Sequence, residues 1–189
     1  MELVSRAVVF ATQAHDGMRR KKDDIPYILH PMEAAAIAGS LTSDENVIAA
    51  ALLHDVVEDT PVTIEEVEEN FGHRVAELVA AETEDKRRDI PADQSWCIRK
   101  EEAIALLRNT KDIGVKIIFL GDKLSNMRSI YRQWMRRGDD VWQDFNQKDP
   151  AMHRWYYRSI AEAVSEFKDT FAWKEFDELI RIVFGEGEK

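Results

Sequence analysis

The residues best suited to chemistry are one histidine and three carboxylates that follow an apolar stretch in the first third of the chain. Residues 47–53 are all apolar and rich in alanine, which predicts a buried helix. The last turns of that helix carry His54, Asp55, Glu58 and Asp59. Residues four apart are neighbours on a helix, so these side chains form two pairs, each on one face. Several charges at one buried end are tolerated only with a cation or fixed donors nearby, because an unpaired buried charge is costly.

Two residues elsewhere in the sequence are candidates to join that group at a metal ion. His30 stands at the start of a helix expected over about residues 31–40, and Asp122 lies in the apolar stripe of a helix expected over about 112–135. The candidate ligands are two imidazoles and two carboxylates: His30, His54, Asp55 and Asp122. Because this set has no thiolate, it disfavours structural zinc and suits a harder divalent ion with open water positions, such as Mn²⁺.

A metal held in this way would favour phosphoryl chemistry. A divalent ion lowers the pKa of a bound water and polarises a phosphoryl oxygen. Glu58 and Asp59, which are not needed as ligands, are candidates to orient that water and relay a proton. The alternative is a buried, salt-bridged polar cluster with no metal. No glycine-rich phosphate loop, Cys-x-x-Cys pair or Gly-x-Ser-x-Gly turn offers a competing catalytic plan.

Composition favours a helical, globular protein and restricts its partners. The chain has 189 residues, of which 44% are hydrophobic, with 8 glycines and 5 prolines. Its formal net charge of −10 argues against general nucleic-acid binding, which depends on lysine and arginine at the phosphates. No apolar run reaches the roughly 18 residues that a membrane helix needs. Cys97 is the single cysteine, which predicts a reducing, cytoplasmic location.

Every strongly periodic segment is helical, so we expect an all-α fold with one domain over residues 1–189, a bundle of about eight to ten helices. The helix with the acidic group is expected over about 45–59. Thr63 with Glu66 predicts a capping box that opens the next helix. The polar loop 86–93 is the segment expected to be mobile. The other expected helices lie at about 3–17, 74–85, 94–109, 140–145, 150–167 and 173–184.

With these residues in view, the sequence resembles the HD-domain hydrolases of the stringent-response alarmone (p)ppGpp, especially the small stand-alone ones. The resemblance extends over about residues 7–130, and its motifs are specific in order and spacing, whereas the last third matches less distinctively. The matching stretches are Ala14-His15-Asp16-Gly17, Arg20-Lys21, Pro26-Tyr27-Ile28-Leu29-His30-Pro31, Ala51 to Thr60, Phe71-Gly72, Thr83-Glu84-Asp85-Lys86 and Asp122 to Arg128.

The resemblance implies one Mn²⁺ per chain on the four candidate ligands, with Glu58 and Asp59 as the catalytic acidic pair. The implied contacts to the phosphates and sugar of the substrate are Arg20, Lys21, Asn126 and Ser129. The implied reaction is hydrolytic removal of pyrophosphate from the 3′ position of guanosine tetra- or pentaphosphate. The partner is then a small nucleotide rather than a nucleic acid or a membrane, and a homodimer is left open.

Departures from the family pattern fall near the pocket and leave the substrate open. Gly121 stands where alanine is usual, and Ser129 stands where threonine is usual. Two alternatives therefore remain: an HD phosphohydrolase acting on another nucleotide, such as the 2′-phosphate of NADPH, or a regulator that binds a nucleotide without turnover. The intact pair Glu58 and Asp59 speaks against the regulator, because pure binding does not require it.

Overall fold

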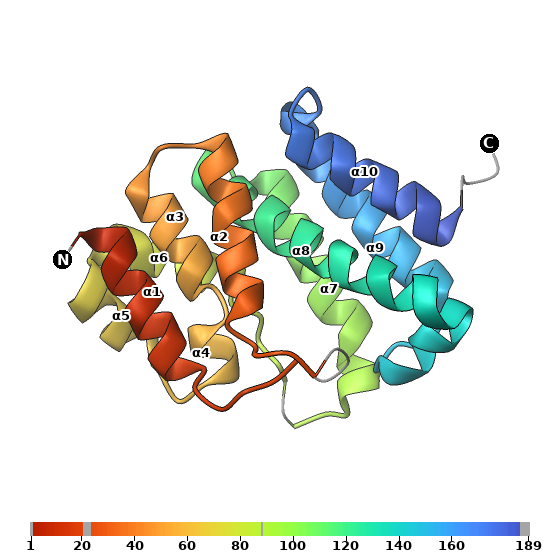
Figure 1. The fold of residues 1–189 in the computed structure, drawn as a ribbon, viewed down its shortest axis with the longest axis horizontal. Helices are drawn as coiled ribbons and strands as arrows, with labels where there is room; N and C mark the ends of the chain where they lie inside the picture. Colours follow the sequence, from red (N-terminus) through yellow and green to blue (C-terminus); the bar gives the residue numbers. More distant parts are fainter. Residues whose placement is uncertain (1, 21–23, 88, 186–189) are drawn as a thin grey trace. The chain divides into compact units, whose positions relative to one another are not determined.

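The structure, a computed structural model, describes residues 2–20, 24–87 and 89–185. Within these ranges the fold is all-α, as expected, with ten α-helices, two short 3₁₀-helices and no strand (Figure 1). None of the described helices is both long and apolar enough to cross a membrane. The chain divides into two compact units, Met1–Glu84 with Lys111–Asp122, and Asp85–Thr110 with Lys123–Lys189. The expectation of a single domain stays a prediction.

The first unit is built around a short, alanine-rich helix, α3. Its elements are α1 (Leu3–Ala14), α2 (Leu29–Leu41), α3 (Glu45–Leu53), α4 (Val56–Asp59), α5 (Ile64–Phe71), α6 (His73–Glu82) and the first part of α8 (Ile113–Arg137). Helix α3 packs against α1, α2 and α6 (Figure 1). Ala49, Ala50 and Ala51 have no exposed surface, and such small side chains let the neighbouring helices approach closely.

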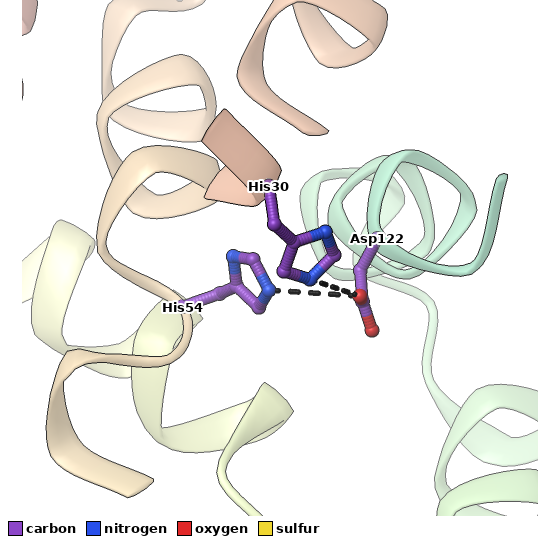
Figure 2. A group of neighbouring side chains, drawn as sticks. All are labelled: His30, His54 and Asp122. Carbon is purple, nitrogen blue, oxygen red and sulfur yellow. Dashed lines mark ion pairs between the residues drawn. The ribbon is translucent and has the colours of Figure 1, made fainter. Parts of the chain in front are cut away.

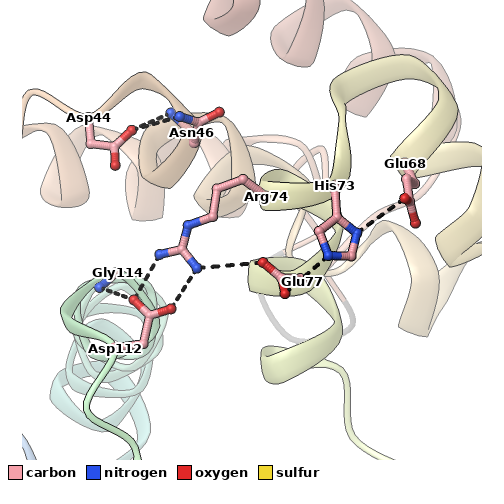
Figure 3. Close-up of polar contacts among 8 residues, drawn as sticks. All are labelled: Asp44, Asn46, Glu68, His73, Arg74, Glu77, Asp112 and Gly114. Atoms are coloured by element: carbon pink, nitrogen blue, oxygen red, sulfur yellow. Dashed lines mark hydrogen bonds and ion pairs between the residues drawn. The ribbon is translucent and has the colours of Figure 1, made fainter.

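Hydrogen-bonded side-chain caps fix the starts of α5 and α8 in this unit. The predicted capping box is confirmed: Thr63 Oγ1 accepts from the Glu66 N–H, and the Glu66 carboxylate accepts from the Thr63 N–H. Before α8, Asp112 Oδ1 accepts from the Gly114 N–H at 2.9 Å. The Arg74 guanidinium binds both oxygens of Asp112, at 2.6 and 2.8 Å (Figure 3). The start of α8 is therefore tied to α6.

The expected continuous helix over residues 45–59 is wrong, because the structure interrupts it at His54 and Asp55. Helix α3 ends at Leu53, and α4 begins at Val56. His54 Nδ1 lies 2.8 Å from the carbonyl oxygen of Ala51, which in a continuous helix would accept from the N–H of residue 55. The imidazole thus takes the place of a helical hydrogen bond, and the two residues stand at a turn.

Helix α2 begins at Leu29, two residues earlier than expected. Pro31 is compatible with this first turn because the first four N–H groups of a helix have no intrahelical partner. The first helix is shorter than expected: it ends at Ala14, and Gly17 follows with a φ of 72°, which glycine adopts without strain. His30 therefore belongs to the first turn of α2.

Aromatic side chains fill much of the second unit. Its elements are α7 (Ala92–Asn109), the rest of α8, η1 (Gly138–Asp144), α9 (Pro150–Ala163), η2 (Ser165–Phe167) and α10 (Phe171–Phe184). Helix α9 packs against α7 and α10. Trp142 stacks on His153 with ring centroids 5.1 Å apart, and Trp96 packs on the same ring at 5.4 Å. Phe171, the first residue of α10, is an exception: its side chain is 93% exposed.

Candidate metal centre and active site

Three segments of the first unit bring His30, His54 and Asp122 together (Figure 2). His30 comes from the first turn of α2, His54 from the turn after α3, and Asp122 from α8. All three side chains are buried, and one ligand-type atom of each lies within 4.8 Å of the others. Because these residues are far apart in the sequence, the cluster depends on how the three segments pack.

The separations between the donor atoms fit ligands around one ion. His30 Nε2 lies 3.0 Å from Asp122 Oδ1, and His54 Nε2 lies 3.6 Å from the same oxygen. Asp55 Oδ2 adds a second carboxylate, 3.5 Å from His30 Nε2 and 3.2 Å from His54 Nε2. Metal–ligand bonds of about 2.1 Å place neighbouring ligand atoms roughly 3.0–3.4 Å apart in octahedral or tetrahedral geometry. The four separations, 3.0–3.6 Å, are close to that spacing, and three of the predicted ligands, His30, His54 and Asp122, form a group that could hold a metal ion.

The tautomer of His54 indicates that a cation belongs between these side chains. The carbonyl of Ala51 can only accept a hydrogen bond, so the nearby Nδ1 carries the proton and a neutral ring has its lone pair on Nε2. That nitrogen is buried and has no hydrogen-bond partner among the described residues. A lone pair beside the carboxylates of Asp55 and Asp122 is repelled unless a proton or a metal ion stands between them. The side chains thus fit a divalent metal.

The same charges set the protonation of the cluster. Burial alone would lower the pKa of His54, but Asp55 and Asp122 raise it well above its ordinary value. Burial lowers the pKa of His30 against the opposing effect of Asp122. Burial would raise the pKa of Asp55, but the nearby imidazoles hold it below its usual range. His30 and Asp55 are therefore in their ligand forms at neutral pH, while a proton on His54 competes with a metal ion.

Tyr27, to which the sequence patterns assigned no role, connects this cluster to one of the predicted catalytic residues. Its hydroxyl oxygen lies 2.6 Å from Asp55 Oδ2 and 2.8 Å from Asp59 Oδ2. Burial, followed by the two carboxylates, raises the pKa of Tyr27 far above its ordinary value, so the hydroxyl keeps its proton. A tyrosine three residues before the candidate ligand His30 was the signal available in the sequence.

Glu58 and Arg20 also belong to the first unit, and each contacts another residue of that unit. Glu58, on α4, accepts a hydrogen bond from the Glu84 N–H through Oε2, at 3.2 Å. The Arg20 guanidinium lies 6.0 Å from the centre of the Tyr27 ring. Lys21, the other predicted phosphate contact in this loop, is outside the described residues.

Asn126 and Ser129 belong to the second unit. They follow Asp122 along α8 at the fourth and seventh positions. Ser129 is buried, and its Oγ accepts from the Gln133 amide at 3.3 Å. Their contact with a substrate stays a prediction.

Comparison with known proteins identifies the family, because residues 7–151 match the HD domain. The chain belongs to the HD-domain family. A guanosine-3′,5′-bis(diphosphate) 3′-pyrophosphohydrolase of Aquifex aeolicus is 32% identical over 190 residues, which cover 100% of this chain and 26% of that protein. A GTP pyrophosphokinase of Brucella ovis is 39% identical over 131 residues, 68% of this chain and 17% of that protein. The chain thus spans at most 26% of the length of these two relatives.

Solved structures extend the likeness over nearly the whole chain. A metazoan protein, described as an orthologue of SpoT that hydrolyses ppGpp and plays a role in starvation responses, has a TM-score of 0.76 and 25% identity, with 98% of both chains covered. A Listeria monocytogenes crystal structure has a TM-score of 0.72 and 30% identity, covering 83% of this chain and 99% of its own. The HD domain is a metal-dependent phosphohydrolase fold, so the family and the buried cluster agree on a divalent metal.

Proposed function

We propose that this chain hydrolyses the 3′-diphosphate of guanosine tetra- or pentaphosphate to GDP or GTP and pyrophosphate, with Mn²⁺ as the cofactor. The observation that carries the proposal is that two buried imidazole nitrogens lie 3.0–3.6 Å from two carboxylate oxygens. The Aquifex relative is named for this reaction, and the metazoan protein is described as hydrolysing ppGpp. Both support the choice of substrate.

Four side chains would hold the ion: His30, His54, Asp55 and Asp122. When bound, the ion lowers the pKa of a water ligand and polarises a phosphoryl oxygen. Two nitrogens and two oxygens without a thiolate leave positions for water and substrate on a six-coordinate ion, which favours Mn²⁺ over structural zinc.

Glu58 and Asp59 are proposed to move the protons. Both lie on α4, and each carboxylate is held by a neighbour, Glu58 by the Glu84 N–H and Asp59 by the Tyr27 hydroxyl. A fixed carboxylate can take a proton from the attacking water and return one to the 3′-oxygen as it leaves. The water oxygen bonds to the phosphorus nearest the ribose while the bond from that phosphorus to the 3′-oxygen breaks, which yields a 3′-hydroxyl and pyrophosphate.

Arg20 is proposed to bind phosphate oxygens of the nucleotide. A guanidinium offers two parallel N–H donors to a phosphate, and here it lies over the ring of Tyr27, next to the acidic side chains. Its charge would offset the repulsion between the polyanionic substrate and these carboxylates. The resemblance to the family suggests Lys21, Asn126 and Ser129 as the further contacts.

The decisive experiment is a product analysis. Purified protein with Mn²⁺ is incubated with guanosine tetraphosphate, guanosine pentaphosphate or NADPH, and the products are separated by anion-exchange chromatography. We expect GDP or GTP with pyrophosphate, and no product in the presence of EDTA. Release of phosphate from NADPH alone would assign a different substrate to the same site. Binding of a nucleotide without any product would identify a regulator and reject the hydrolase.

A further inference from the structure

The hydroxyl of Tyr27 stands between two carboxylates that have different tasks in the proposed reaction. Asp55 Oδ2, 2.6 Å away, is the same oxygen that lies 3.2 Å from His54 Nε2, so it faces the position of the metal. Asp59 Oδ2, 2.8 Å away, belongs to the acidic pair on α4. Two neighbouring carboxylates repel each other, and the single hydroxyl proton, shared between the two oxygens, offsets part of this repulsion and limits the rotation of each side chain.

The ring of Tyr27 is itself held from several directions. Its backbone N–H donates to the Met18 carbonyl at 2.9 Å. The buried ring of His15 packs against it with centroids 4.9 Å apart, and His30 meets it edge-on at 6.0 Å. Because these contacts hold the ring, the position of the hydroxyl is fixed. A residue that orients the ligands of a metal site needs such a fixed donor.

We propose that Tyr27 is a positioning residue that orients Asp55 toward the metal and Asp59 toward the reacting water, so that one hydroxyl links metal binding to proton transfer. The inference rests on the proposed function, because it uses the roles assigned there to the two carboxylates. Hydrogen-bond partners of metal ligands typically change metal affinity or activity by about 10–100-fold when they are removed. A tyrosine that served only to pack its ring would show no such effect on loss of the hydroxyl.

Tyr27→Phe tests this directly, since the substitution keeps the ring and removes one oxygen. We expect Mn²⁺ affinity, measured by calorimetric titration, and kcat toward guanosine tetraphosphate each to fall about 10–100-fold. KM should change less than kcat, because the hydroxyl does not touch substrate in this proposal. Placing 4-aminophenylalanine at position 27 returns an N–H donor and should restore much of both quantities.

Tyr131→Phe is the matched control. Tyr131 is also half-buried, but it follows Asp122 by about two and a half turns of α8 and so leaves from the opposite side of that helix. Removal of its hydroxyl should leave Mn²⁺ affinity and kcat within about twofold of the unmodified protein.

Three results would overturn the inference: unchanged Mn²⁺ affinity and kcat in a folded Tyr27→Phe protein, an equal loss in the control, or no rescue by the aromatic amine. Far-ultraviolet circular dichroism shows whether the variant is folded. If Tyr27→Phe is unfolded, the 4-aminophenylalanine variant is tested instead, and we expect it to bind Mn²⁺ with near-normal affinity. A 10-fold loss of Mn²⁺ affinity in that variant would contradict the inference. The Mn²⁺ titration needs no substrate. If the protein hydrolyses no alarmone but Tyr27→Phe still lowers its Mn²⁺ affinity, the proposed substrate is wrong, whereas the proposed orientation of Asp55 by Tyr27 stands.

Discussion

His54 uses its two ring nitrogens for different purposes, and each depends on the other. Nδ1 donates to the Ala51 carbonyl and thereby interrupts the helix. In the neutral ring the same bond leaves the lone pair on Nε2, next to Asp55 and Asp122, where a metal ion would take the place of the second proton. A single hydrogen bond thus shapes the backbone and selects the tautomer that can bind a metal.

The division between ligands and proton-transfer residues can be tested by neutralising carboxylates in two ways. Glu58→Gln combined with Asp59→Asn should lower kcat by at least about 100-fold, because proton transfer is lost, while Mn²⁺ affinity changes only a few-fold. Asp122→Asn, which also removes a buried negative charge, should abolish both activity and Mn²⁺ binding. Titration calorimetry and product analysis measure the two quantities. If the double variant kept near-normal turnover, the assignment of the acidic pair would be wrong.

Arg20→Ala should act on substrate binding rather than on chemistry. Loss of a guanidinium–phosphate contact of about 1.4 kcal/mol would raise KM about tenfold and leave kcat nearly unchanged. Arg19→Ala is the control, because that side chain is 56% exposed and pairs with Asp24. Steady-state kinetics with guanosine tetraphosphate distinguish the two. An unchanged KM for Arg20→Ala would place the phosphates elsewhere.

The sequence predicted the residues of the metal cluster better than the side chains that hydrogen-bond to them. Histidines and aspartates in apolar settings identified the cluster, since buried charges demand a partner. Tyr27 stands in one of the matching stretches but was given no role there, because its hydroxyl contacts Asp55 and Asp59 only in the folded chain and no local pattern encodes that contact.

Among the helices, the approach of α8 to α2 sets the position of Asp122. A Cβ atom at Gly121 would lie 2.7 Å from the carbonyl oxygen of Ala34, a backbone atom that cannot swing away. Glycine at position 121 therefore allows α2 and α8 to approach closely beside the candidate metal ligands. Apolar periodicity predicted the helices themselves. It did not predict the close approach of α8 to α2 or the break at His54, because both depend on particular side-chain contacts rather than on a periodic pattern.

Gly121→Ala should weaken metal binding even though alanine favours a helix by about 1 kcal/mol. Relief of the clash would move Asp122 away from His30, so we expect about tenfold weaker Mn²⁺ binding and a loss of stability of about 1–3 kcal/mol. Gly39→Ala is the matched control, because its nearest neighbour would be the Cδ1 atom of Ile48 at 3.8 Å. That variant should be slightly stabilised, with normal Mn²⁺ affinity. Equal behaviour of the two variants would contradict the argument.

The cap of α8 should make stability depend on pH. The hydrogen bonds from Arg74 hold the pKa of Asp112 below its ordinary value, so this carboxylate stabilises the fold above the unfolded pKa of about 3.9. That contribution is lost as the pH falls through the folded pKa. Asp112→Ala should lower the free energy of unfolding by about 1–2 kcal/mol at pH 7. Below about pH 4 the variant and the unmodified protein should become more similar in free energy of unfolding. Denaturant unfolding at several pH values measures it; a difference that is constant with pH would exclude the ionised cap.

The positions of the tryptophans make it possible to follow the two units of the molecule separately. All 5 tryptophans, Trp96, Trp134, Trp142, Trp155 and Trp173, belong to the second unit, whereas the four proposed metal ligands belong to the first. Tryptophan fluorescence therefore reports on the second unit, while far-ultraviolet circular dichroism reports on the helices of both. Because residues of α8 belong to both units, we expect the two units to unfold in one cooperative transition.

Mn²⁺ should then raise the melting temperature seen by both signals. Its ligands come from three separate segments, so binding adds its free energy to folding, about 2.7 kcal/mol when free Mn²⁺ is 100 times the Kd. For a chain of this size that corresponds to a rise of roughly 5–11 °C, which EDTA should reverse. Asp122→Asn should abolish the rise, and Glu58→Gln with Asp59→Asn should retain it. A shift in circular dichroism without a shift in fluorescence would show that the units unfold separately, and the expectation of one domain would then be wrong.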